Sequence, residues 1–169
     1  MLSSMFGLDG RVAVVTGALG RLGREYVRVL AEAGAAVGAI DVAGDPQAFA
    51  GLTKSGHRIH VELADLSIKA ETDRAMDAIV AAIGAPTILV NNAGMGSSPA
   101  AAGLETGPFE DYPEVAWDTM IDSHLKTTLF ATQAFIRHFR ARRESEGPPS
   151  RERFGETGSD SDDSDADRD

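Results

Sequence analysis

Three glycines at regular spacing are the residues whose types and positions first point to chemistry. Gly17, Gly20 and Gly23 lie between an apolar run and a helical pattern. Glycine lets a backbone turn tightly and approach a ligand closely, and a helix N-terminus offers free N–H groups and about half a positive charge. Asp41 ends the next apolar run, close to the offset of about 20 residues at which a carboxylate binds ribose hydroxyls. This combination predicts a site for a dinucleotide.

The charges near Asp41 bear on which dinucleotide is bound. Its carboxylate would repel the 2′-phosphate of NADP, and Val42 supplies no compensating charge, so we expect NAD. Arg21 could reach a phosphate, which leaves NADP as the alternative cofactor. A solvated strand end is the alternative interpretation of Asp41.

Alternating strands and helices must position these residues. The predicted strands cover residues 11–16, 36–42, 58–63 and 87–90, and the predicted helices cover 21–33, a short segment opened by Pro46, 67–83 and 113–139. On helix 21–33 the apolar residues that fall on one face are Leu22, Tyr26, Val29, Leu30 and Ala33. Such alternation implies right-handed βαβ units. We therefore predict an α/β fold, a partial Rossmann-type doubly wound parallel sheet of about four strands with flanking helices.

The chain divides into two segments of different composition. Residues 1–139 carry the strand and helix patterns and form the predicted, incomplete nucleotide-binding domain. Residues 140–169 have almost no large apolar side chain beyond Phe154 and end in a run of Ser and Asp. Such a segment cannot bury enough apolar surface to offset roughly 1–2 kcal/mol of backbone entropy per residue. We expect a disordered, acidic tail there.

Composition excludes several classes of function. The net charge of −10 argues against nucleic acid or an anionic membrane as a partner. The chain has no cysteine, which excludes disulfides and thiol catalysis, and no metal site is predicted. It also has neither an apolar run long enough for a membrane span nor a signal-peptide pattern, so we expect a cytoplasmic protein.

Further motifs follow the later strands. Asp65 and Leu66 come after the third predicted strand, and Asn91-Asn92-Ala93-Gly94 comes after the fourth. Together with Thr16–Gly23, and in this order, they resemble the successive motifs of the short-chain dehydrogenase/reductase family over residues 7–139. The stretch Gly107–Pro113, followed by Trp117, is similar to sugar-acid or polyol dehydrogenases. The resemblance implies an NAD(P)-dependent oxidoreductase that acts on a small alcohol or ketone, with a dimer contact along helix 113–139.

The resemblance also implies a role for each matching residue. Gly17, Gly20 and Gly23 would line the pyrophosphate, with the amides of Arg21 and Leu22 beside it. Asp41 would bind the ribose, and Asp65 and Leu66 would contact the adenine. The residues expected beneath the ribose and nicotinamide are Asn92, Ala93 and Gly94.

Two positions depart from the family pattern. The middle glycine, Gly20, stands one residue earlier than in the commoner motif. His124 stands where the family usually has Asn, at a bend that holds a water of the proton relay, and Thr127 stands where Gly is frequent. An imidazole could donate a hydrogen bond, so His124 is the one candidate catalytic residue; a helix histidine packed at an interface is the alternative.

The family's remaining catalytic residues have no counterpart in these 169 residues. A tyrosine four positions before a lysine serves as acid or base, and a serine orients the carbonyl. Tyr26 is followed at that distance by Leu30, and Tyr112 by Ala116. We therefore expect the chain to be inactive alone, as a truncated or frame-shifted dehydrogenase. The alternatives are a noncatalytic NAD-binding or regulatory module, and an interaction protein whose acidic tail binds a basic partner.

Overall fold

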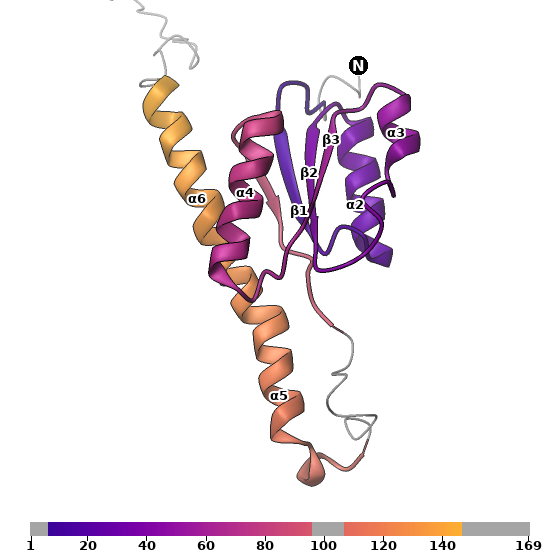
Figure 1. Ribbon diagram of the computed structural model, residues 1–169, viewed down its shortest axis with the longest axis vertical. Helices are drawn as coiled ribbons and strands as arrows, with labels where there is room; N and C mark the ends of the chain where they lie inside the picture. Colours follow the sequence, from indigo (N-terminus) through magenta and orange to yellow (C-terminus); the bar gives the residue numbers. More distant parts are fainter. Residues whose placement is uncertain (1–6, 96–106, 147–169) are drawn as a thin grey trace, which may run out of the picture.

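Four parallel strands form the centre of the molecule. The computed structural model describes residues 7–95 and 107–146. Its strands, β1 (Val12–Thr16), β2 (Ala36–Asp41), β3 (Ile59–Leu63) and β4 (Ile88–Val90), are arranged in the order β3-β2-β1-β4, as Figure 1 shows. The strand order reverses at β1, with β2 and β3 on one side and β4 on the other. The predicted α/β class and doubly wound parallel sheet are confirmed.

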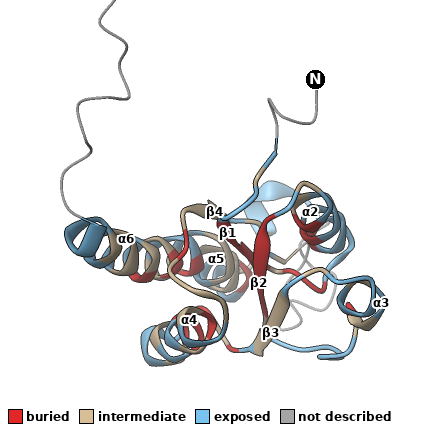
Figure 2. Ribbon diagram, turned by 90° about the horizontal axis from the view of Figure 1, so that it is seen from above, coloured by how far each residue is buried: buried red, intermediate tan, exposed pale blue. Residues whose placement is uncertain are grey.

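Helices cover both faces of this sheet. Figure 2 shows α2 (Arg21–Glu32) and α3 (Ala50–Lys54) on one face, and α4 (Lys69–Ile83), α5 (Glu114–Ile121) and α6 (Thr127–Glu146) on the other. Each face has its own apolar core. Every residue of β1 is buried, as its run of β-branched side chains predicts for a parallel strand covered on both faces. Among the described residues, no helix is long and apolar enough to cross a membrane.

The face that α2 turns to the sheet differs from the predicted one. Its buried residues are Gly23, Val27 and Ala31. Of the expected face only Leu30 packs against the core, whereas the side chains left in solvent are Leu22, Tyr26 and Val29, exposed by 63%, 42% and 53%. Small residues at two of the three buried positions let the helix approach the strands closely. A hydrophobic pattern that gives more weight to larger side chains predicts burial of the neighbouring face, which carries the larger apolar residues.

The predicted helix 113–139 is divided in two by a π-helical turn. α5 leads into a π-helical turn at Asp122–Lys126, and α6 then continues to Glu146, so that the segment forms the long orange-to-yellow rod of Figure 1. Residues 140–146, expected to begin the disordered tail, are therefore helical. They are mostly Arg, Ala and Glu, which are strong helix formers, and Arg142 pairs with Glu146 at 2.6 Å. Residues 147–169 lie outside the described residues.

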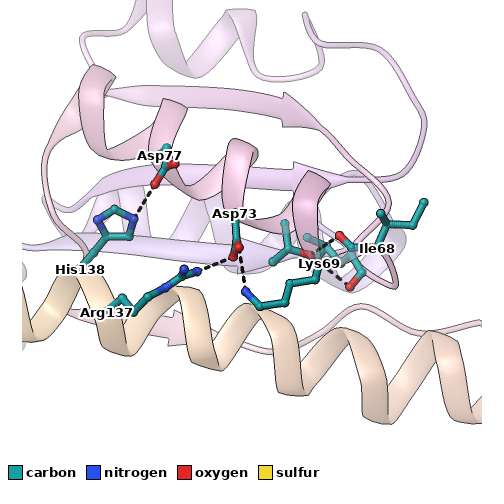
Figure 3. Close-up of polar contacts among 8 residues, drawn as sticks. Ile68, Lys69, Asp73, Asp77, Arg137 and His138 are labelled. Atoms are coloured by element: carbon teal, nitrogen blue, oxygen red, sulfur yellow. Dashed lines mark hydrogen bonds and ion pairs between the residues drawn. The ribbon is translucent and has the colours of Figure 1, made fainter.

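Polar contacts fasten α6 to α4. Figure 3 shows Asp73 accepting hydrogen bonds from Lys69 and from Arg137 of α6, and His138 paired with Asp77 at 2.8 Å. The hydrogen bonds from Lys69 and Arg137 hold the pKa of the Asp73 carboxyl below its ordinary value. Together with the apolar contacts of Ala134 in the core, they fix where the rod lies relative to the sheet.

Candidate functional site

One large cavity opens at the carboxyl ends of the strands. It has a volume of about 1000 Å³, at the upper end of the range of about 300–1,000 Å³ for cofactor and ligand sites. Ten of the twelve predicted site residues line it: Gly17, Gly20, Arg21, Leu22, Asp41, Asp65, Leu66, Asn92, Ala93 and Gly94. The other two, Gly23 and His124, lie outside its lining. The cavity adjoins the point where the strand order reverses, which is where open α/β sheets bind ligands.

The glycine-rich turn needs glycine for steric reasons. Gly17 has φ +61°, and a Cβ on it would lie 2.9 Å from Ala93 Cα. A Cβ on Gly23 would lie 2.0 Å from the carbonyl oxygen of Gly17. Gly20 is the N-cap of α2 and has no side chain to bind the first N–H groups of the helix, so these remain available to an anion. Gly23 thus affects the site indirectly, because the absence of a side chain there allows α2 to lie against the glycine-rich turn.

Asp41 is held in a defined orientation at the end of β2. Its Oδ2 accepts a hydrogen bond of 2.8 Å from the Leu19 amide, and its Oδ1 accepts one of 2.8 Å from the Val42 amide. The bond from Leu19 connects the carboxylate to the glycine-rich turn. The arrangement presents a negative charge to the cavity beside the first turn of α2.

Thr16 joins the glycine-rich turn to the loop after β4. Its buried Oγ1 donates to Val90 O and accepts hydrogen bonds of 3.0 Å from the amides of Asn92 and Ala93. The Asn92 side chain donates in return to the carbonyl oxygens of Thr16 and Gly17, at 3.1 and 3.0 Å. From the sequence, Thr16 was predicted to belong to the glycine-rich motif but was given no role of its own. No local feature of the sequence indicated that Thr16 connects two loops, because this role depends on the loop after β4 lying beside the glycine-rich turn.

Asp65 is occupied by local contacts. Its Oδ1 accepts hydrogen bonds from the amide and hydroxyl of Ser67, at 2.9 and 2.7 Å, and its own amide donates to Glu71 at 2.8 Å. This turn before α4 contributes Asp65, Leu66 and Ser67 to the lining of the cavity. Ser67 and Glu71 were not predicted. An acidic residue in the first helical turn is the signal that could have identified Glu71.

The remaining wall belongs to α5 and the π-helical turn. Its lining residues are Val115, Asp118, Thr119, Asp122, Ser123 and Thr127. A π-helical turn, Asp122–Lys126, lies where the resemblance implied a bend near His124. The imidazole of His124 lies against the backbone of Gly94, and its Nδ1 lies 3.0 Å from Met120 O and 2.9 Å from Ser123 Oγ.

Comparisons with known proteins agree with this geometry. The family model for the short chain dehydrogenases matches residues 11–147. The 2-dehydro-3-deoxy-D-gluconate 5-dehydrogenase of Escherichia coli is 32% identical over 139 residues, which cover 82% of this chain and 52% of that protein. The galactitol 2-dehydrogenase of Rhizobium johnstonii is 37% identical over 137 residues, covering 78% of this chain and 49% of that protein.

A solved structure shows the same architecture. The gluconate 5-dehydrogenase of Burkholderia cenocepacia, in complex with NADP and tartrate, superposes with a TM-score of 0.68 at 30% identity, over 84% of this chain and 53% of that one. The chain thus spans about half the length of the relatives that it matches. The family match over most of the chain, the strand order and the cavity at the strand ends lead to one conclusion: the chain belongs to the short-chain dehydrogenase family.

Proposed function

We propose that this chain binds a nicotinamide dinucleotide in the cavity at the strand ends, NAD in preference to NADP. The observation that carries the proposal is that ten residues from four separate segments, each selected from the sequence, line one cavity. The pyrophosphate would lie at the free N–H groups of α2, and the adenosine ribose would donate hydrogen bonds to Asp41. The nicotinamide end would lie over Asn92–Gly94.

Asp41 supports NAD rather than NADP. A 2′-phosphate at the ribose position would lie beside a carboxylate whose two oxygens are already fixed by backbone amides. Arg21 also lines the cavity and is the residue through which NADP would be favoured. Because the Burkholderia relative is an NADP complex, both cofactors belong in the test.

The test is calorimetric titration of the purified chain and of Asp41→Asn with NAD and with NADP. Hydrogen bonds to a charged group contribute about 1.5–3 kcal/mol, so NAD affinity should fall by roughly tenfold or more while NADP affinity rises. The control is Asp45→Asn, which removes a nearby exposed carboxylate that does not line the cavity. An unchanged ratio of the two affinities in Asp41→Asn would refute the assignment of Asp41.

Chemistry on an alcohol or ketone is proposed for a protein of the relatives' length, not for this chain alone. The 169 residues contain no Tyr-x-x-x-Lys, and neither Tyr26 nor Tyr112 has the required lysine. Losing a general acid typically costs about 10²–10⁴ in rate. We expect no formation of NADH from NAD with polyols or sugar acids. Turnover that Asp41→Asn abolishes would contradict this part of the proposal.

We also propose that the rod of α5 and α6 is a contact between two copies of the chain. Leu125, Leu129 and Ile136 lie on one stripe and are exposed by 63%, 51% and 38%, on the side opposite the buried Ala131 and Ala134. An apolar stripe with spacings of four and seven residues suits packing against another helix. Sedimentation of the wild-type chain should show a dimer.

A further inference from the structure

The imidazole of His124 occupies the space directly beside Gly94. A Cβ built on Gly94 would lie 2.5 Å from Nε2 of the ring and 2.7 Å from Cδ2, far inside ordinary contact distance. Gly94 itself lines the cavity, whereas His124 does not. The ring therefore supports the cavity wall from outside without contacting the cavity.

The ring has little freedom to move away. Met120 O can only accept a hydrogen bond, so the 3.0 Å contact indicates that Nδ1 carries its proton and donates it there. Ser123 Oγ provides a second contact of 2.9 Å at the same nitrogen. With Nδ1 anchored on the preceding turn, the opposite edge of the ring is directed at Gly94.

The backbone that carries His124 is also fixed. Its carbonyl oxygen lies in the π-helical turn and accepts hydrogen bonds from the hydroxyls of Thr127, at 3.3 Å, and Thr128, at 2.7 Å. The contacts of Arg137 and His138 with α4 hold the following helix in place (Figure 3). The His124 ring is thus a rigid contact between the rod and the Asn92–Gly94 loop.

We propose that His124 is a positioning residue for the cofactor: its anchored imidazole sets where the Gly94 backbone lies in the cavity wall. This inference rests on the proposed binding of a nicotinamide dinucleotide. His124 acts through Gly94 and does not touch the cofactor. Shortening the side chain leaves the loop without its support, and a side chain on Gly94 pushes the loop into the cavity because the ring cannot yield.

The test is a double-mutant cycle on NAD affinity with Gly94→Ala, His124→Ala and the double variant. Gly94→Ala should weaken NAD binding by roughly tenfold or more, and His124→Ala by about threefold to tenfold. The double variant should bind NAD more tightly than Gly94→Ala alone, because the new methyl group occupies the space that the ring leaves. The matched control is His57→Ala, which removes a histidine that precedes β3, at the amino ends of the strands and outside the cavity lining, and should leave NAD affinity unchanged.

Each outcome separates this inference from the proposed function. If the wild-type chain binds NAD and Gly94→Ala has the same effect with and without His124, the positioning role is refuted while the proposed function stands. If the folded wild-type chain does not bind NAD, the proposed function fails. The same double-mutant cycle, measured by thermal unfolding, then tests whether His124 and Gly94 are in contact. His124→Ala should partly restore the melting temperature of Gly94→Ala, and additive losses of melting temperature would refute the contact. The unfolding measurement also tests the contact if Gly94→Ala is too unstable to be titrated with NAD.

Discussion

Replacing Gly23 by alanine tests whether the turn and α2 must lie in direct contact. A Cβ at this position would lie 2.0 Å from Gly17 O, 2.7 Å from Ala18 Cα and 2.8 Å from Gly17 C. All three atoms belong to the backbone, so no side chain can rotate out of the way. Optimal carbon–carbon contacts are about 3.5–4.0 Å, so α2 and the turn must separate by roughly 1 Å.

The free-energy change combines two opposing effects. Overpacking a closely packed site costs about 1–3 kcal/mol and sometimes more, whereas alanine in place of glycine within a helix contributes about 1 kcal/mol of stability. Because the contacts at Gly23 are with backbone, we take the upper end of the first range. Gly23→Ala should then lower the free energy of unfolding by about 2 kcal/mol, which corresponds to a melting temperature lower by roughly 4–8 °C in a domain of this size. The displaced first turn of α2 should also weaken NAD binding.

The assay is thermal unfolding followed by circular dichroism, with NAD titration of the same samples. The control is Gly51→Ala in α3, where a Cβ would meet nothing within 4 Å. The same substitution should there raise stability by about 0.5–1 kcal/mol. A Gly23→Ala variant as stable as the wild type, with unchanged NAD affinity, would refute the steric argument.

Thr16→Val leaves the amides of Asn92 and Ala93 without their acceptor. It should lower the free energy of unfolding, measured by urea titration, by about 1–3 kcal/mol. An unchanged free energy of unfolding would show that this connection does not stabilise the fold. Asp73→Asn should lower stability at neutral pH by roughly 0.2–1 kcal/mol. Because the folded-state pKa of Asp73 is lowered from 3.8, the stability of these contacts is present above that value and is lost as the pH falls through the folded-state pKa. Unfolding curves recorded as a function of pH should therefore show a shallower acid dependence for Asp73→Asn, and parallel curves would count against the contact. Leu129→Glu should convert the expected dimer to a monomer in sedimentation experiments, whereas Glu144→Gln, an exposed substitution on the same helix, should not.

Strands and turns were predictable because their signals are local. The β-branched run of β1 and the glycines that follow it determine a buried strand and a tight turn without reference to the rest of the chain. Asp41 could likewise be placed at a strand end by its offset from the glycines. The parallel sheet and the meeting of these residues at one edge then follow from the rules for βαβ units.

Other features depend on contacts between distant segments. The buried face of α2 is set by how closely it approaches the strands, which Gly23 and Ala31 permit and hydrophobicity alone does not reveal. The connecting role of Thr16 requires knowing that the loop after β4 lies next to the glycine-rich turn. The contact of His124 with Gly94 joins the π-helical turn to the loop after β4, two segments that lie far apart in the sequence.

Whether the cavity at the strand ends holds the cofactor can be tested residue by residue. The most direct measurement is a titration of the isotope-labelled chain with NAD, followed by amide chemical shifts in NMR spectra. We expect saturable shifts at residues 17–23, 41–42, 65–67 and 92–94. We expect none at the separate cavity of about 390 Å³ lined by residues between Pro46 and Val61. A folded chain that shows no shifts, or shifts confined to that second cavity, would contradict the proposed site.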